Sequence, residues 1–176
     1  LIKMQQYKEA TEDIDAILSQ DPDEEAALLL RGKVKEAAGQ QEEAETDYRY
    51  VTELNPFNEQ AFLCLGQLYI VQKKYPEAIA LFDEAIELNP NFAEAYYNRG
   101  TLLALSGKLP EAFEDFSRAI ELNPLFAEAF YNRGMTQIYM KDTRKGCLDL
   151  SKAGELGITS AYEILKRYTG EHTEAF

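Results

Sequence analysis

The sequence contains few of the residues and motifs on which most catalytic and membrane-spanning proteins depend. It has one histidine and two cysteines, and it contains no run of 18 apolar residues. It also contains no glycine-rich phosphate loop, no HExxH motif and no GxSxG motif. The histidine, His172, lies in the C-terminal tail, where no neighbouring side chains would hold it for acid–base chemistry. We therefore predict no catalytic site, no cofactor and no membrane insertion.

The two cysteines favour packing roles over metal or disulfide chemistry. Cys64 and Cys147 lie far apart in the sequence and belong to no CxxC or Cys/His pattern, which predicts no metal site. We expect both to be free thiols, which fits a reducing compartment and favours the cytoplasm. Residues 1–8 show no secretory signal, but the chain begins without methionine, and we expect it to be part of a longer protein.

Basic residues are outnumbered by acidic ones. The chain has 18 lysines and arginines against 31 aspartates and glutamates, which gives a formal net charge of -13 at pH 7. This charge opposes binding to the phosphate backbone of nucleic acids and to anionic lipid surfaces. We predict that the chain binds neither nucleic acid nor a membrane surface.

What the sequence does contain is a strict 34-residue period. The segments LNPNFAEAYYNRG (88–100) and LNPLFAEAFYNRG (122–134) differ at only two positions. A fixed period of this length is the signature of a repeat architecture in which each unit packs on its neighbours. All six prolines fall on the period, at positions 22, 56, 90 and 124 and at positions 76 and 110.

Each period predicts a hairpin of two helices. In the unit that begins at residue 59, apolar and small residues from Phe62 to Tyr69 follow the i, i+3, i+4, i+7 spacing of one helix face. A second helix begins at Pro76, because proline is favoured in the first turn of a helix, and its apolar stripe runs to Ile86. This helix ends at Asn89, since a residue that precedes proline is pushed out of the helical conformation.

This pattern resembles the tetratricopeptide repeat, whose signature sets aromatic, Leu-Gly, Tyr, Ala, Phe and Pro residues at fixed spacings. The resemblance implies an all-α fold, a right-handed α-solenoid of antiparallel helix–turn–helix units. It covers nearly the whole chain. The matching residues of the second unit are Phe62, Leu65, Gly66, Tyr69, Ala78, Phe82 and Pro90.

We expect one solenoid over residues 1–176, built from units of unequal regularity. A half unit that contains only a second helix comes first, and a capping helix covers the last apolar face before a short tail. The predicted bounds are 1–24 for the half unit, 25–58, 59–92 and 93–126 for three full units, 127–158 for a degenerate fourth unit, 159–169 for the capping helix and 170–176 for the tail.

Charged residues recur at two positions of the repeat. Three units carry arginine at the seventh position and aspartate sixteen residues later, whereas the second unit has Leu65 and Leu81 at those places. Because both charges are absent together, we predict an ion pair between the two helices of a hairpin. The alternative is that these are unrelated surface charges. The predicted structural pairs are Arg31 with Asp47, Arg99 with Asp115, and Arg133 with Asp149.

In the family that the chain resembles, the first helices line a concave groove that binds peptides, and the resemblance implies the same surface here. We expect Tyr97 and Tyr131 to be spare aromatic anchors, because the aromatic residue before each one already occupies the packing position. Asn98 and Asn132 would bond either a ligand's backbone or a neighbouring helix and water. The positions carried over are Gln60, Leu63, Cys64, Gln67, Ile70 and Val71, then Glu94, Tyr97, Asn98, Thr101, Ala104 and Leu105, then Glu128, Tyr131, Asn132, Met135, Ile138 and Tyr139.

The leading hypothesis is a non-catalytic scaffold that binds a protein or peptide in the concave groove. The alternative is a structural assembly or self-association module that uses the open N-terminal face or the convex side. The half unit motivates this alternative, since its apolar stripe of Tyr7, Ala10, Ile14 and Ile17 would lack the first helix that normally covers it.

Overall fold

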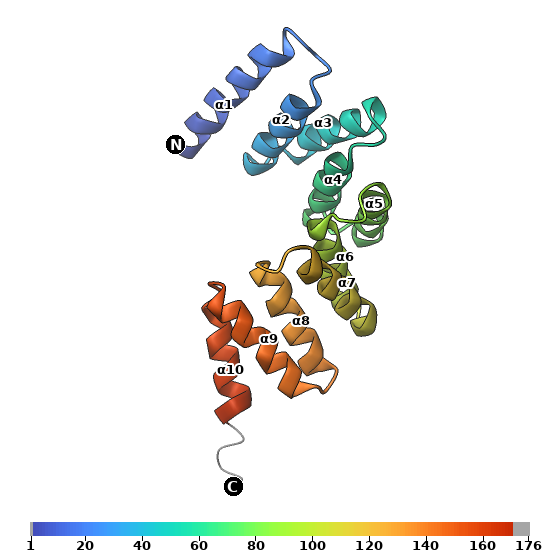
Figure 1. Ribbon diagram of the computed structural model, residues 1–176. Helices are drawn as coiled ribbons and strands as arrows, with labels where there is room; N and C mark the ends of the chain where they lie inside the picture. Colours follow the sequence, from blue (N-terminus) through green and yellow to red (C-terminus); the bar gives the residue numbers. More distant parts are fainter. Residues whose placement is uncertain (1, 171–176) are drawn as a thin grey trace. The chain divides into compact units, whose positions relative to one another are not determined.

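The computed structural model describes residues 2–170 of the chain, and the side chains of residues 7–169. Over this range all regular elements are α-helices (Figure 1). They fall into two compact units, Leu1–Pro90, called the N-terminal unit below, and Asn91–Phe176, called the C-terminal unit. The helices are α1 (Ile2–Leu18), α2 (Glu25–Ala37), α3 (Gln41–Leu54), α4 (Glu59–Val71), α5 (Tyr75–Leu88), α6 (Ala93–Leu105), α7 (Leu109–Leu122), α8 (Ala127–Tyr139), α9 (Thr143–Glu155) and α10 (Ser160–Gly170).

The period found in the sequence governs where helices begin and end. The first helices α2, α4, α6 and α8 begin at positions 25, 59, 93 and 127, so that each start lies one period after the previous one. The second helices α3, α5 and α7 end one residue before an asparagine that takes an extended conformation and precedes proline. The division of the chain into repeat units with the bounds given above remains our proposal. The predicted tail, residues 170–176, lies outside the described residues except for Gly170, which belongs to α10.

Each hairpin turn uses one residue in the left-handed region. The fifteenth residue of the four units has a positive φ, and it is Gly39, Lys73, Gly107 or Lys141. The next backbone N–H donates to a carbonyl five residues earlier, as in the bond of 2.9 Å from Lys74 to Tyr69. This closure satisfies carbonyl groups that the helix end leaves open. Two of the four turns therefore carry a lysine where glycine is the unstrained choice.

Replacing Lys73 by glycine should raise the free energy of unfolding by about 0.5–1 kcal/mol, because the strain of a left-handed lysine exceeds the entropy gained by an unfolded glycine. Urea denaturation followed by circular dichroism measures the change. The matched variant is Gly107→Ala. An added Cβ meets nothing within 4 Å there, so the substitution introduces the strain of a left-handed residue without a steric clash. Gly107→Ala should lower the free energy of unfolding by a similar amount. Equal stabilities of the wild type and the two variants would contradict the argument that a left-handed lysine is strained.

The two helices of a hairpin approach closely at a glycine. A Cβ atom placed on Gly66 of α4 would lie 2.5 Å from the ring of Phe82 on α5, which is too close for any side chain. In the last hairpin the contact is between backbones, since a Cβ on Gly134 would lie 2.8 Å from the carbonyl oxygen of Gly146. Small residues at these places let the helix axes approach, and the large rings fill the space around them.

The arginines and aspartates at the seventh and twenty-third positions are in contact in three hairpins. Each arginine makes two hydrogen bonds to both carboxylate oxygens of its aspartate, in the planar geometry that suits a guanidinium group. The hydrogen bonds that Arg31 donates to the Asp47 carboxylate hold the pKa of its guanidinium above the usual value. The donor–acceptor distances are 3.0 and 2.7 Å for Arg31 with Asp47, 2.8 and 2.7 Å for Arg99 with Asp115, and 2.7 and 2.9 Å for Arg133 with Asp149.

Removing Asp149 alone should cost more stability than removing both members of its pair. Asp149 is buried, so Asp149→Leu leaves the Arg133 charge partly desolvated and should lower the free energy of unfolding by about 2–3 kcal/mol. The double variant Arg133→Leu/Asp149→Leu copies the leucine pair of the second unit and should recover most of that loss. Urea denaturation of the three proteins tests this, and a double variant less stable than Asp149→Leu would refute the pairing argument.

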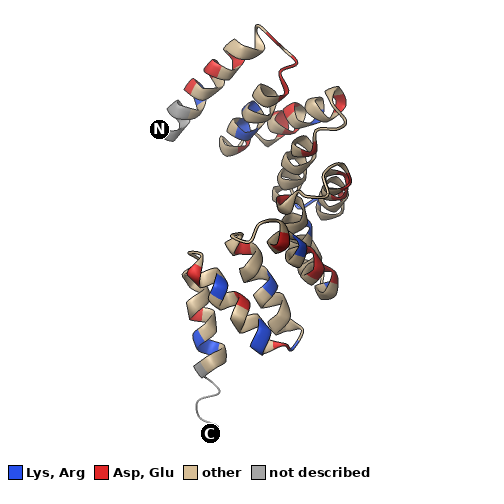
Figure 2. Cartoon of the chain, in the orientation of Figure 1, with Lys and Arg blue, Asp and Glu red and all other residues tan. Residues whose placement is uncertain are grey.

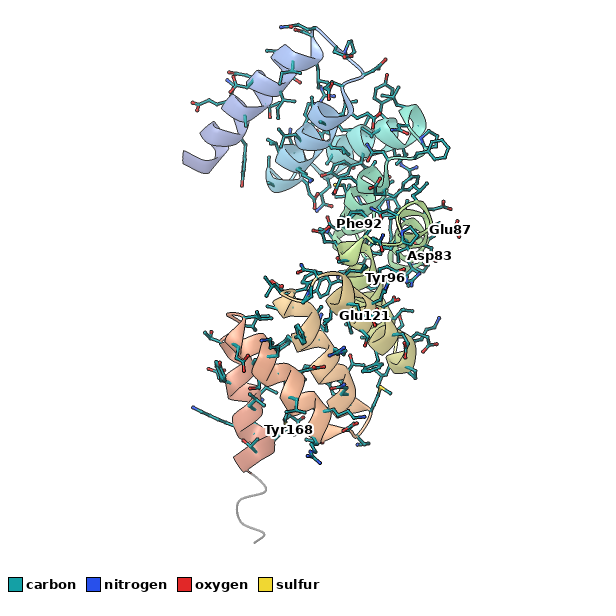
Figure 3. The ribbon with its side chains drawn as sticks, in the orientation of Figure 1. Asp83, Glu87, Phe92, Tyr96, Glu121 and Tyr168 are labelled. Carbon is teal, nitrogen blue, oxygen red and sulfur yellow. The ribbon has the colours of Figure 1, made fainter. Side chains whose placement is uncertain are left out.

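The last described helix packs against the core of the C-terminal unit. Helix α10 packs against α9, and the ring of Tyr162 lies over Gly154, which has no side chain to obstruct it. Ala161 is fully buried with Leu150 and Ala153, and Tyr168 packs against the same cluster (Figure 3). Its role as a cap and the right-handed sense of the solenoid remain predictions.

Candidate functional site

A cavity of about 270 Å³ lies in the C-terminal unit, between helices α6, α7 and α8. Its walls combine aliphatic and aromatic side chains with a few polar groups, the composition typical of ligand sites. Leu105 and Tyr139 are 72% and 62% exposed, whereas Phe116 and Thr136 are buried at its floor. The lining residues are Thr101, Ala104, Leu105, Leu109, Phe116, Tyr131, Asn132, Met135, Thr136 and Tyr139.

Helical spacing brings these side chains to one place. Thr101, Ala104 and Leu105 stand at i, i+3 and i+4 on α6, which is one face of a helix. On α8, Met135 and Tyr139 are four residues apart and share a face in the same way. The cavity thus contains Thr101, Ala104, Leu105, Tyr131, Asn132, Met135 and Tyr139 from the groove positions carried over from the family.

Three lining residues were not among the predicted groove positions. Leu109 and Phe116 come from the second helix α7, and the carried-over positions are confined to first helices. Thr136 bonds the carbonyl of Asn132 through its hydroxyl at 2.7 Å and is buried. Phe116 stands one period after Phe82 of the repeat signature, and it also lines the cavity because the floor of the cavity is the hairpin core.

The two asparagines have different partners. The side-chain amide of Asn132 donates to the Tyr97 hydroxyl at 3.3 Å and to the Thr101 hydroxyl at 3.4 Å, both on α6. The amide of Asn98 donates to the carbonyl of Glu94 in its own helix at 2.7 Å. Asn132 therefore links two first helices at the edge of the cavity, whereas Asn98 lies outside the cavity.

Tyr97 does not have the spare role that the sequence suggested. Its ring centroid lies 4.8 Å from that of Phe126 and 6.0 Å from that of Phe116, both in tilted contact. Burial, followed by the charge of Glu128, raises the pKa of its hydroxyl. The expectation that only one of two adjacent aromatic residues packs was wrong, because Tyr97 faces the following hairpin while Tyr96 stacks under Arg99 with the guanidinium carbon 5.6 Å from the ring centroid.

Three of the carried-over positions are wrong as ligand contacts, because the structure buries them. Leu63, Cys64 and Ile138 are 3%, 2% and 7% exposed, so none of these side chains is available to a ligand. Gln67 and Ile70 of the N-terminal unit are half-buried, and they do not line the 270 Å³ cavity. Glu94 and Glu128 are exposed in the first turns of α6 and α8, where a carboxylate is stabilised by the helix dipole.

The described residues offer no cluster for metal binding, since no three histidine, cysteine or acidic side chains among them converge. Burial raises the pKa of the Cys64 and Cys147 thiols, which makes both poor nucleophiles. His172 lies outside the described residues. Between residues 2 and 170, no helix has the length and apolar character that a membrane crossing requires.

Three family profiles match the chain. Two described as a tetratricopeptide repeat match residues 1–59 and 93–126, and one described as a TPR repeat matches residues 66–107. The chain is a tetratricopeptide-repeat protein. A comparison with curated protein sequences yields no match.

Solved structures agree with the family on the all-α solenoid fold. The crystal structure of MamA superposes with a TM-score of 0.73 at 24% identity, over 89% of this chain and 91% of that one. YrrB, described as a tetratricopeptide-repeat protein with an unusual peptide-binding site, gives a TM-score of 0.71 at 27% identity, over 94% and 87%. TTC0263 from Thermus thermophilus gives a TM-score of 0.74 at 17% identity, over 95% of this chain and 91% of that one.

Truncating Tyr97 should destabilise this tetratricopeptide-repeat protein. Tyr97→Ala removes a packed ring and should lower the free energy of unfolding by about 3 kcal/mol, whereas Tyr97→Phe keeps the ring and should cost at most about 1 kcal/mol. Urea denaturation distinguishes the two variants. A loss below about 1 kcal/mol for Tyr97→Ala would restore the spare-anchor interpretation.

Proposed function

We propose that this protein is a non-catalytic scaffold that binds a polypeptide, and that the cavity between α6, α7 and α8 receives an apolar side chain of the ligand. The observation that supports the proposal best is the combination of a 270 Å³ hollow with exposed apolar residues, Leu105 and Tyr139, at its edge. Exposed apolar groups beside a hollow gain from being covered by a partner.

The polar groups of the cavity suit an extended peptide. The amide nitrogen of Asn132 is already engaged with Tyr97 and Thr101, and its oxygen has no donor among the described residues. That oxygen can accept a hydrogen bond from a backbone N–H of a peptide. Such a bond fixes the position of the ligand, while the apolar contacts with Leu105, Met135 and Tyr139 supply most of the affinity.

Charge is distributed unequally over the chain. Residues 1–90 contain 19 acidic and 8 basic residues, whereas residues 91–176 contain 12 and 10 (Figure 2). The cavity therefore belongs to the unit with little net charge, and an apolar ligand segment meets no strong field there. The acidic balance also disfavours nucleic acid as a partner.

The relatives support the same class of function. Tetratricopeptide repeats form interaction scaffolds, and the similar protein YrrB is described as having a peptide-binding site. The fold of these relatives therefore suits polypeptide binding. The α6–α8 cavity is proposed as the binding site from the geometry of this chain alone.

Self-association through the N-terminal face has less support. Helix α1 packs on α2, and its residues Ile14 and Leu18 are buried. Of the predicted apolar stripe, only Ile17 is exposed, while Tyr7 and Ala10 are half-buried. Over the side chains of α1 that the structure describes, residues 7–18, this stripe exposes one large aliphatic residue, which is a small area for a stable dimer.

Peptides selected for binding should depend on the exposed edge of the cavity. A peptide-display library is panned against the wild-type chain, and affinities for the selected peptides are measured by calorimetry. Leu105→Asp/Tyr139→Ala should weaken binding at least about tenfold, since it places a charge in the apolar contact and removes a ring. Raising the salt from about 50 to about 500 mM should change the affinity less than about threefold, because the contact is apolar.

The matched control is Leu125→Asp. Leu125 is 73% exposed, like Leu105, but it lies in the α7–α8 turn and does not line the cavity. Binding should be unchanged in this variant, and circular dichroism should show the same helix content in all three proteins. Selected peptides that bind the Leu105→Asp/Tyr139→Ala protein as tightly as wild type would refute the cavity as the binding site.

A further inference from the structure

A second cavity, of about 200 Å³, lies in the C-terminal unit between α7 and the turn that joins α8 to α9. Phe113 and Met140 form its apolar walls, and Gln137 also lines it. Asp142 and Lys145 complete the lining and form an ion pair of 3.1 Å with each other. None of these five residues lines the larger cavity, so the two sites are separate.

Gln137 is 7% exposed, and its side-chain oxygen has no hydrogen-bond partner among the described residues. A buried acceptor without a donor is costly, and native structures leave few of them. The unpartnered oxygen lines a cavity that is large enough for a ring. This combination indicates a ligand that carries both an apolar body and a donor.

The equivalent place in the N-terminal unit shows which group fits. Tyr69 stands two periods before Gln137, and its buried ring fills this position. Its hydroxyl donates to Glu45 at 2.9 Å, and the Lys74 ammonium lies 4.7 Å from the centre of its ring. Glu45 is the equivalent of Phe113, and Lys74 is the equivalent of Asp142.

The two units thus differ in what they supply at this position. In the N-terminal unit the chain provides both the phenol ring and the acceptor, Glu45. In the C-terminal unit it provides an acceptor, Gln137, but no phenol ring, and Phe113 makes the wall apolar where the other unit has a carboxylate. The space that a tyrosine fills in one unit is a cavity in the other.

We propose that this cavity binds a tyrosine side chain of a partner polypeptide. The ring lies between Phe113 and Met140, and the hydroxyl donates to the side-chain oxygen of Gln137. Because a phenol satisfies both the apolar walls and the buried acceptor, it binds better than an apolar ring of the same size. The site goes beyond the α6–α8 cavity and does not depend on it.

The test uses p-cresol, the side-chain analogue of tyrosine, and toluene, which has the same ring without the hydroxyl. Both are titrated into the full chain labelled on its methionine methyl groups. The chain has three methionines, and Met140 lines this cavity while Met135 lines the other. We expect p-cresol to shift the Met140 signal saturably and to bind at least about fivefold more tightly than toluene.

Two substitutions of Gln137 separate what its side-chain oxygen and what the open space contribute to p-cresol binding. Gln137→Leu keeps the size of the side chain but removes the acceptor, and should bring the affinity for p-cresol down to that for toluene. Gln137→Tyr supplies the ring from within, as Tyr69 does in the N-terminal unit, and should abolish the Met140 shift. The Leu105→Asp/Tyr139→Ala protein should bind p-cresol unchanged, which keeps this result independent of the proposed function.

Equal affinities of the wild-type chain for p-cresol and toluene would overturn the proposal, and this comparison needs no variant to fold. So would an unchanged affinity in Gln137→Leu, or a saturable shift at Met135 in place of Met140. Circular dichroism of each variant, matched to wild type, establishes that a lost signal reports the cavity and not the loss of the fold.

Discussion

The close approach of two helices at a glycine is the contact on which each hairpin depends. In α4 and α5 an aromatic ring lies directly on Gly66, and in α8 and α9 the backbones of Gly134 and Gly146 touch. No side chain larger than hydrogen fits at these points without moving the helices apart. Arg99 directly precedes Gly100, and its partner Asp115 directly precedes the packed ring of Phe116. Arg133 and Asp149 stand in the same way beside Gly134 and Leu150, so the ion pair forms together with the close contact.

This neighbouring pair can be ionic or apolar without changing the hairpin. Arg99 and Asp115 pair beside the contact of Gly100 with Phe116, whereas leucines stand at the same places beside Gly66. An ion pair at a partly buried position contributes little net stability, since desolvation offsets the attraction. Its bidentate geometry instead restricts how one helix can slide along the other.

Because the hairpin contacts recur in every period, the positions outside them are free to differ between units. Tyr69 and Gln137 occupy equivalent places, yet one fills its site and the other leaves a hollow with a buried acceptor. The larger cavity arises in the same way, since its floor is the recurring hairpin core at Phe116 while its edge is made of exposed Leu105 and Tyr139. A constant frame thus leaves cavities that are specific to one unit.

The groove positions carried over from the family lie together where helical spacing places them on one face, and several are buried where neighbouring hairpins pack against them. Thr101, Asn132 and Met135 line one cavity because residues three and four apart share a helix face. Leu63 and Ile138 stand at other carried-over positions, but neighbouring helices bury them. Tyr97 directly follows another aromatic residue, Tyr96, yet both rings pack, each against a different neighbour.

The amino-acid sequence by itself determined the period, the start of each first helix, the hairpin turns and the charged pairs, since all of these depend on residues within one repeat unit. The tertiary structure alone decided which groove positions remain open, which partner Asn132 bonds, and that the Gln137 oxygen lies unpaired in a cavity. Those properties depend on contacts between hairpins. A periodic pattern specifies which face a residue lies on, but only the volumes of the side chains packed against that face determine whether space is left.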